Sequence, residues 1–291
     1  MGDAKRLIVK PISAKDACKI VQSLHYSGKT VQNSQLHFGV FMDGRCGGAM
    51  QFGPSLDKRK MLGLVEGTLW NEFIELNRMA FADWLPRNGE SRALGFAFRW
   101  MRKQYPQLKW VVSFADGCQC GDGTIYRASG FVLTAIKTNN QIWEAPSGEV
   151  FCDTSIRPGI GGERERERAK QVFSRTSLTD GRSKQQQQQQ AKEIISRTTT
   201  TKGQHILETG ASSMKQYKDA GWKPKEGFQL RYIYFLDPTA RERLTVPILP
   251  FSEIDRRGAG MYKGKPRVTS TGSGASTIQV EGGGAIPTVT L

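Results

Sequence analysis

Residues 73–116 read FIELNRMAFADWLPRNGESRALGFAFRWMRKQYPQLKWVVSFAD, and this stretch decides the fold class. Its first nine residues predict a strand, which a turn rich in Pro, Asn and Gly follows. From Ser91 onward apolar residues recur at helical spacing until a proline ends the pattern. The last eight residues form the continuous apolar run of a buried parallel strand. A strand–turn–helix–strand unit of this kind predicts an α/β fold.

The segments on either side continue the alternation of strands and helices. Ser13 is placed to cap a helix that follows the strand pattern RLIVKPI, and Asp43-Gly44 is a strong hairpin signal. Downstream we expect a short helix and then an antiparallel pair of strands. The expected elements are strands at 6–12, 36–42, 45–53, 131–137, 141–145 and 229–237, and helices at 14–26 and 121–130. The order predicts a mixed central β-sheet flanked by helices.

The composition indicates a globular protein, because 38% of the 291 residues are hydrophobic and 24% are charged. No window approaches the ~20 apolar residues of a membrane span, and the N-terminal stretch has no secretory apolar core. We therefore expect a cytoplasmic protein. The five scattered cysteines do not suit a disulfide framework. The net charge of +15 favours a polyanionic partner, with nucleic acid as the first candidate.

The composition also changes along the chain. GERERERAK, six successive glutamines and a run of four threonines lack the periodicity of a packed element. A clear strand pattern, QLRYIYFLD, then returns. We expect a catalytic core at 1–160, a flexible charged and Gln-rich insertion at 161–213, a resumed core strand with a basic DNA-contacting segment at 214–265, and a disordered tail at 266–291.

The turn at 86–95 is placed so that backbone N–H groups and a helix N-terminus can hold a pyrophosphate. A buried strand follows, and then Tyr126 with Gly130-Phe131 at the opening of the next strand. This combined order resembles the GNAT superfamily of acyl-CoA-dependent transferases. The usual GNAT loop runs Arg/Gln-x-x-Gly-x-Gly/Ala. The corresponding loop here is Asn88-Gly89-Glu90-Ser91-Arg92-Ala93, with Asn at the first position and Ser at the central glycine.

Several longer blocks resemble a more specific family. The chain is similar to the Mom proteins, which are DNA-modification proteins of phages and prophages. The likeness covers most of 5–160 and again about 214–265, whereas 163–205 have no counterpart. The blocks are LHYSG (24–28), FIELNRMA (73–80), NGESRALGFAFRW (88–100), KWVVSFADGCQCGDGTIYRASGF (109–131), RYIYFLD (231–237) and VPILPFSEIDRRGAGMYKGK (246–265).

The resemblance implies an activity, a donor and a metal. Mom proteins add a carbamoylmethyl (acetamido) group to the exocyclic amino group of adenine in double-stranded DNA, which protects phage DNA from host restriction. The implied donor is acetyl-CoA or a related acyl-CoA, and the implied metal is iron. The implied iron ligands are His25, Tyr26 and Asp116, and the residues implied for the acyl-CoA pocket and catalysis are Arg78, Asn88, Gly89, Ser91, Arg92, Ala93 and Tyr126.

Taken without the family, the proposed iron ligands have simpler interpretations. His25 falls near a helix C-terminus, where a histidine commonly caps the helix or compensates its dipole. Asp116 precedes glycine and can make a turn after its strand. Asp122 can cap the next helix instead, which would leave Asp116 for a site. One imidazole with two oxygen donors suits non-haem iron, although the set is not the usual two-histidine one-carboxylate triad.

The residues of the acyl-CoA pocket also have structural alternatives. Strand alternation places Arg78 on one face with Ile74, Leu76 and Ala80, where it needs a carboxylate or a bound anion. Ser91 is a good helix N-cap. Tyr126 can be core packing, or its hydroxyl can donate a proton to a departing thiolate.

The basic residues near the C-terminal end are candidates for DNA contact, because lysine and arginine neutralise phosphates. They are Arg256, Arg257, Lys263, Lys265 and Arg267. Chemistry on a base within a duplex requires that the base leave the stack, so a stacking aromatic residue is expected at the site. Trp70, Trp84, Trp143 and Tyr262 are candidates among which the sequence does not choose.

Two further functions are compatible with the sequence. An ordinary N-acetyltransferase would act on a protein or small amine, and its product would be N-acetyl. A carbamoylmethyl product is different, since nitrogen bonds to the former methyl carbon, and a redox-active metal offers a route to that connection. The other alternative is a non-catalytic DNA-binding protein that retains a transferase fold.

Overall fold

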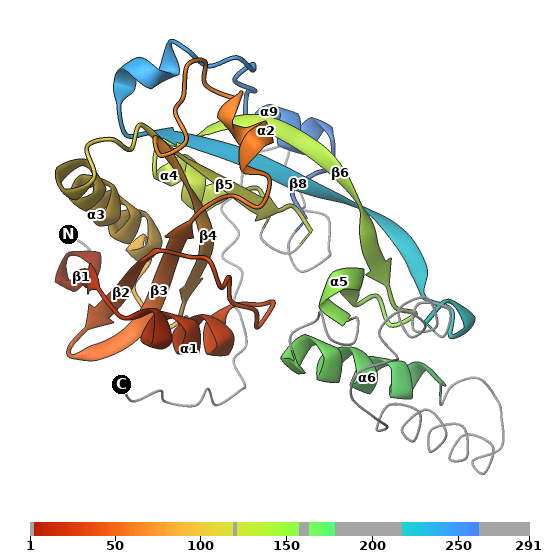
Figure 1. Ribbon diagram of the computed structural model, residues 1–291. Coiled ribbons are helices and arrows are strands. Elements are labelled where there is room, and N and C mark those ends of the chain that lie inside the picture. The colour runs from red at the N-terminus through yellow and green to blue at the C-terminus, as the bar shows by residue number, and fades with distance from the viewer. Residues whose placement is uncertain (1–2, 119–120, 157–162, 178–216, 262–291) are drawn as a thin grey trace, which may run out of the picture. The chain divides into compact units, whose positions relative to one another are not determined.

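The computed structural model describes residues 3–118, 121–156, 163–177 and 217–261. Its strands form one sheet in the order β1-β2-β3-β4-β5-β8-β6-β7 (Figure 1). The expected class, a mixed α/β chain with a central sheet flanked by helices, is confirmed. The strands are β1 (Ile8–Pro11), β2 (Leu36–Met42), β3 (Arg45–Gly53), β4 (Phe73–Phe81), β5 (Trp110–Asp116), β6 (Val132–Glu144), β7 (Val150–Cys152) and β8 (Lys223–Phe235).

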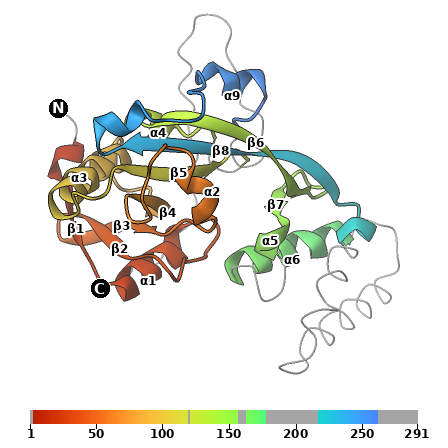
Figure 2. The same cartoon turned by 45° about the horizontal axis from the view of Figure 1, so that its top comes forward.

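Helices cover both faces of the strands β2 to β5 (Figures 1 and 2). Helix α3 packs its buried apolar side chains on one face, and α1 and α2 pack on the other. None of the described helices is long and apolar enough to cross a membrane. The helices are α1 (Ala14–Leu24), α2 (Lys58–Leu62), α3 (Gly89–Gln104), α4 (Thr124–Ala128), α5 (Asp153–Ile156), α6 (Glu163–Ser177) and α9 (Ser252–Arg256), with single 3-10 turns at Asp3–Arg6 and Pro238–Arg241.

Local sequence signals explain the first part of the sheet. The Ser13 hydroxyl accepts the backbone N–H of Asp16 at 3.1 Å and caps α1 as expected. The turn at Asp43-Gly44 places both residues at positive φ and joins β2 to β3 as an antiparallel hairpin. The predicted buried parallel strand is β5, which pairs with β4 in parallel and with β8 in antiparallel orientation.

Strands β4 and β5 are paired over only part of their length. Their parallel ladder joins Phe73–Leu76 to Trp110–Ser113, whereas β4 continues to Phe81 and β5 to Asp116. Beyond Ser113, β5 still pairs with β8, and beyond Leu76, β4 still pairs with β3. The two strands therefore part at Leu76 and Ser113, and their backbone groups beyond that point do not bond to each other.

A β-bulge changes which side chains of β4 share a face. Opposite β3, Arg78 pairs with Gln51 and Leu76 pairs with Phe52, so Asn77 is the additional residue on β4. Leu76 packs in the cluster formed with α3, whereas Ala80 packs against α1. The expectation that Arg78 shares a face with Ile74 and Leu76 is therefore wrong, because the bulge reverses the alternation after Asn77.

The predicted pair of strands at 131–137 and 141–145 is also wrong. One strand, β6, runs through the whole of Val132–Glu144, and its last residues pair with β7. β6 and β8 are neighbours in the sheet and run side by side in both views (Figure 2). The polar residues at 138–140 lie within β6, which neighbours β8 in the sheet.

The chain divides into two compact units. The first comprises 1–25, 30–137 and 228–291, and the second comprises 26–29 and 138–227. The second unit has its own core, in which Phe151 and Trp222 pack with Ala169 and Val172 of α6. The predicted boundary at residue 160 stays a prediction. The described start of the predicted insertion is the helix α6, in which Ala169 and Val172 are buried. The remainder of that insertion, at 178–213, and the predicted tail lie outside the described residues.

Candidate active site

Tyr126 lies at the point where β4 and β5 part. Its ring stacks on Tyr232, with centroids 4.9 Å apart and an interplanar angle of 22°. Its hydroxyl oxygen lies 3.0 Å from Ser113 Oγ, which also lies 3.3 Å from the carbonyl oxygen of Leu76. Because Leu76 and Ser113 are the last parallel pair, the phenol is held beside the opening between the strands.

The hydrogen bond from Ser113 determines what Tyr126 can do. The Ser113 hydroxyl has one proton, which it donates either to the Leu76 carbonyl or to the Tyr126 phenol oxygen. In the second arrangement the phenol oxygen is the acceptor, and the phenol proton can be donated to a further group. A phenol in this position can therefore act as a general acid for a group that enters the opening. Sequence reasoning missed Ser113, although it is a lone hydroxyl residue within the apolar run of β5.

The loop between β4 and α3 contains the residues expected to hold a pyrophosphate. Asn88 has φ of 66°, a left-handed conformation that asparagine tolerates, and α3 begins at Gly89. In a parallel β–α–β connection, a helix N-terminus that follows the carboxyl end of its strand is a common anion site. α3 is 16 residues long, and its first turn presents backbone N–H groups.

Ser91 is not the N-cap of α3. The helix begins two residues earlier than expected, and the Ser91 hydroxyl donates to the Asn88 carbonyl at 3.1 Å. Arg92 is exposed, and its guanidinium donates to the Lys5 carbonyl at 3.3 Å. Ala93 is fully buried in the core beneath the helix. Of these three, Ser91 is the residue whose side chain remains at the loop.

On the α1 side of the sheet, His25 and Arg78 lie close together. His25 occupies the C-cap position of α1, and its backbone N–H donates to the Val21 carbonyl at 2.9 Å. Burial and the nearby Arg78 charge lower the pKa of His25 to about 3. The imidazole is therefore neutral at neutral pH and does not compensate the helix dipole.

Glu75 joins this cluster because of the bulge at Asn77. Burial raises the pKa of Glu75, while hydrogen bonds from Ser55 and Asn77 and the charge of Arg78 act in the opposite direction. The Arg78 guanidinium also donates to the Asn77 carbonyl at 2.6 Å. Regular alternation would separate Glu75 from Arg78, so sequence reasoning did not identify the pair.

Two aspartates near the end of β5 have structural contacts. One Asp116 carboxylate oxygen accepts the backbone N–H of Cys118 at 2.8 Å, which closes the turn after the strand. Asp122 accepts the backbone N–H of Thr124 at 3.1 Å and forms an ion pair with Arg127 at 2.8 Å. Asp122 was expected to cap the next helix; Gly123 occupies the N-cap position of α4, and Asp122, one residue earlier, binds the backbone N–H of the first helical residue.

The residues implied as iron ligands are divided between the two units. His25 and Asp116 belong to the first unit, and Tyr26, which is 41% exposed, belongs to the second. Within the described ranges, no three His, Cys, Asp or Glu side chains are grouped so that they could hold a metal ion.

The candidates for DNA contact differ in their surroundings. Arg256 and Arg257 both form ion pairs with Glu253, at 2.7 and 3.3 Å. Trp143 is 9% exposed and packs in the core of the second unit. Trp84 stacks with Arg45 at 4.8 Å, whereas Trp70 is 53% exposed and lines a cavity of about 430 Å³. Tyr262, Lys263, Lys265 and Arg267 lie outside the described residues.

Solved structures similar to this chain are GNAT acetyltransferases, but the likeness is weak. The ribosomal-protein-S18-alanine N-acetyltransferase from Escherichia coli is 15% identical, with a TM-score of 0.34 over 50% of this chain and 88% of that chain. The IAA acetyltransferase from Bacillus cereus is 14% identical, with a TM-score of 0.33 over 45% of this chain and 80% of that chain. Scores this low carry no conclusion about function.

Sequence comparison is more specific. The chain is 43% identical over 129 residues to the methylcarbamoylase Mom of Escherichia phage Mu, a match that covers 44% of this chain and 53% of the relative. The chain thus spans about half the length of that curated relative. A model of the Mom protein family matches residues 6–191, which is well over half of the chain. The match includes 163–191, so the expectation that this segment has no counterpart in the family is wrong. The protein belongs to the Mom protein family.

Proposed function

We propose that this protein is a transferase that modifies adenine in double-stranded DNA, adding a carbamoylmethyl group to the exocyclic amino group. Membership of the Mom family supports the proposal, as does the name of the phage Mu relative, a methylcarbamoylase. The structural observation that carries it is the Tyr126 hydroxyl, held by Ser113 where β4 and β5 part. Modified adenines would protect phage DNA from host restriction.

The donor in this proposal is acetyl-CoA or a related acyl-CoA. Its pyrophosphate lies at the N-terminus of α3, where Asn88, Gly89 and Ser91 form the loop. The thioester then reaches the opening between β4 and β5. When a nitrogen nucleophile bonds to the thioester carbonyl carbon and forms the amide, the C–S bond breaks, and Tyr126 donates a proton to the thiolate sulfur that leaves.

The acceptor amine approaches the side of β4 that carries Glu75 and Arg78. A guanidinium beside a buried carboxyl can orient a polar substrate and stabilise negative charge as it develops. The adenine must leave the duplex to reach this position, because its amino group is inside the stack.

Iron is the metal that the resemblance implies, and His25, Tyr26 and Asp116 are its proposed ligands. A neutral imidazole with phenol and carboxylate oxygens is a donor set that suits non-haem iron, and His25 has the neutral form that a ligand needs. Bound iron would supply the redox chemistry needed to activate the methyl carbon. Metal analysis of the purified protein tests this, because His25→Ala and Asp116→Ala should each lower the iron content while Asp83→Ala should not.

Mass spectrometry of nucleosides tests the proposed function. Bacterial DNA is digested after expression of the protein, and we expect deoxyadenosine that carries a carbamoylmethyl group. An N-acetyl product would indicate an ordinary acetyltransferase instead. Unmodified DNA from cells that contain soluble protein would overturn the proposal.

Asp116→Ala serves as a second arm of this experiment. We expect the variant to fold and to lose modification, while Asp83→Ala, which changes an exposed aspartate after β4, retains it. Retained activity in Asp116→Ala would overturn the role given to this residue.

A further inference from the structure

The loop that leads into α2 is anchored to the polar cluster on β4. The Pro54 carbonyl accepts a hydrogen bond from the Asn77 side chain at 3.4 Å, and the buried Ser55 hydrogen-bonds with Glu75. The position of the next residue, Leu56, is therefore fixed by contacts with the residues that surround Arg78. A loop held in this way can present its tip to a substrate, and little conformational entropy is lost when the substrate binds.

The tip of the loop is a leucine that is 95% exposed. Leu69 and Trp70, from the segment before β4, are also exposed, and Lys58 links the two segments because its ammonium lies 4.4 Å from the centroid of the Trp70 ring. Single exposed apolar residues are common, but three on adjoining segments are typical of a binding surface.

Basic side chains also lie on this surface, together with the Glu72 carboxylate, which accepts the Leu69 backbone N–H at 2.9 Å. α2 begins with Lys58, Arg59 and Lys60, and the charge of Lys137 acts on Asp57 at the start of that helix. Asp57 pairs with Lys60 at 2.6 Å. In the part of the chain that the structure describes, no carboxylate forms an ion pair with Lys58 or Arg59. Cations beside exposed apolar side chains fit a polyanion with stacked bases, that is, DNA.

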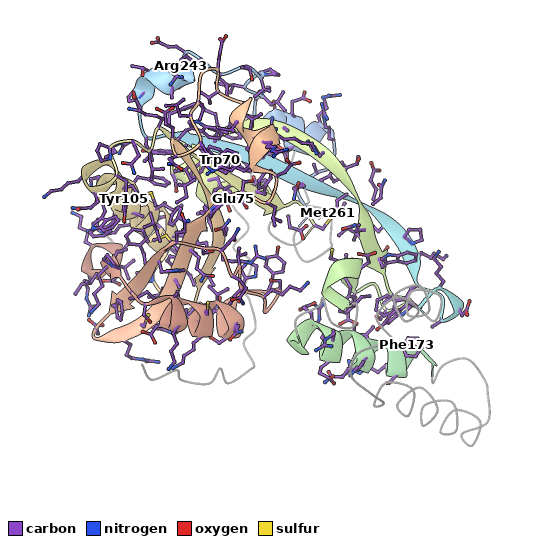
Figure 3. All side chains as sticks on the ribbon, in the orientation of Figure 1. Trp70, Glu75, Tyr105, Phe173, Arg243 and Met261 are labelled. Carbon is purple, nitrogen blue, oxygen red and sulfur yellow. The ribbon has the colours of Figure 1, made fainter. Side chains whose placement is uncertain are left out.

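A cavity of about 430 Å³ is lined by Trp70, Lys58 and Tyr105 among others. Trp70 and Tyr105 are labelled in Figure 3. The volume falls within the range of pockets that hold small ligands. Its lining includes Gln35, Asn71 and Gln107, residues that carry side-chain amides. Amide groups pair with the edges of bases, adenine above all, and an indole offers a stacking surface.

We propose that the surface formed by Leu56, Lys58, Arg59 and Trp70 opens the DNA duplex. Leu56 enters the base stack as a wedge, the two cations contact phosphates, and an unstacked base is received on Trp70. An apolar wedge compensates part of the stacking that is lost when a base leaves the duplex. This inference rests on the proposed function, since it identifies how DNA is engaged, and it selects Trp70 from the four aromatic candidates.

The test separates DNA binding from base unstacking and needs no acyl donor. The probes are a set of short duplexes. In each duplex 2-aminopurine replaces one adenine, and the set covers every combination of bases next to that position. Fluorescence anisotropy gives affinity, and 2-aminopurine fluorescence reports unstacking. We expect the full-length protein to bind the duplexes and raise the fluorescence in at least one context.

Each variant has a distinct expected result. Leu56→Ala should lose most of the fluorescence rise while affinity changes by less than about 3-fold, because a wedge adds little to phosphate contact. Trp70→Ala should weaken binding roughly 5- to 150-fold, the range for loss of one stacked base. The double change Lys58→Ala, Arg59→Ala should lower the slope of log affinity against log salt by about 2. Ile8→Ala, which changes another exposed residue of the first unit, is the matched control and should match the unmodified protein.

The outcomes also separate this inference from the proposed function. If DNA is unstacked through Leu56 and Trp70 but never modified, the inference holds and the proposed function fails. If adenine is modified while Leu56→Ala and Trp70→Ala unstack and bind DNA normally, the inference is overturned. If the variants bind DNA with unchanged affinity but no longer bind a partner protein, the surface is a protein-docking site and the inference is overturned.

Discussion

Tyr126 is the residue whose position says most about the chemistry. Its ring is held between Tyr232 and Phe131, and its hydroxyl meets Ser113 beside the strand opening. A tyrosine that only filled the core would not need its hydroxyl at that opening. The structural and catalytic interpretations are therefore compatible, because the packed ring is what fixes the hydroxyl in place.

We expect Tyr126→Phe to lower the rate of adenine modification about 100-fold or more, the usual effect of removing a general acid. The affinity for acetyl-CoA, measured by calorimetry, should stay within about 3-fold, because the phenol acts on the leaving group. Tyr234→Phe is the matched control, since it removes a hydroxyl that only accepts a hydrogen bond from Arg102. Equal rates in the two variants would remove Tyr126 from the mechanism.

Glu75 gives a prediction about pH and stability. Burial raises its pKa, so the folded state keeps this proton to a higher pH than the unfolded state does. Stability contributed by the protonated form is therefore present at low pH and is lost as pH rises from the unfolded pKa through the folded pKa. We expect Glu75→Gln to raise Tm at neutral pH and to leave Tm unchanged below the ordinary glutamate pKa.

Thermal unfolding across a pH series measures this effect, with the exposed Glu66→Gln as control. A lower Tm for Glu75→Gln at neutral pH would show that Arg78 stabilises the ionised carboxylate by more than burial destabilises it.

At the scale of elements, the bulge in β4 determines the composition of the site. By adding Asn77 to the strand, it places Arg78 on the same face as Glu75 and turns both towards the α1 side. Asn77 is buried and accepts the Ser34 hydroxyl at 3.0 Å while it donates to Pro54 at 3.4 Å. These two bonds tie the start of β2 and the loop after β3 to the bulge.

We expect Asn77→Ala to lower the free energy of unfolding by about 1–3 kcal/mol, because buried partners lose their hydrogen bonds. Urea denaturation measures this change. The exposed Asn71→Ala is the control and should shift stability by less than about 0.5 kcal/mol. A small change in stability for Asn77→Ala would mean that the pairing of β3 with β4 maintains the bulge without the Asn77 side chain.

At the scale of the whole molecule, the proposed donor site lies within one unit. Arg78, the loop at 88–93 and Tyr126 all belong to the first unit. The second unit has a separate core, in which Phe151 lies 5.1 Å from Trp222 between ring centroids and 4.6 Å from the Arg168 guanidinium. Damage to that core should therefore leave donor binding intact.

We expect Phe151→Ala to destabilise the second unit by about 3–5 kcal/mol, since the ring is almost fully buried. Hydrogen exchange should show loss of protection in α6 and β7. Acetyl-CoA affinity, measured by calorimetry, should be unchanged. Loss of that affinity would show that the donor pocket depends on the second unit.

Local sequence patterns predict elements of the first unit, and longer blocks indicate the family to which the chain belongs. Apolar periodicity, the cap at Ser13 and the turn at Asp43-Gly44 depend on residues close in the chain, so they predict α1, the β2–β3 hairpin, α3 and β5 correctly. The strand–loop–helix order predicts where a donor loop would lie, and the long blocks similar to Mom proteins indicated the family that the comparison confirmed.

Which residues contact one another follows from the tertiary structure alone. The bulge at Asn77, the parting of β4 from β5 and the single long strand β6 all depend on pairing with strands distant in sequence. The Ser113–Tyr126 contact and the Glu75–Arg78 pair follow from those pairings and have no local signature. Side-chain alternation predicts faces only while a ladder is regular, and one added residue reverses every face beyond it.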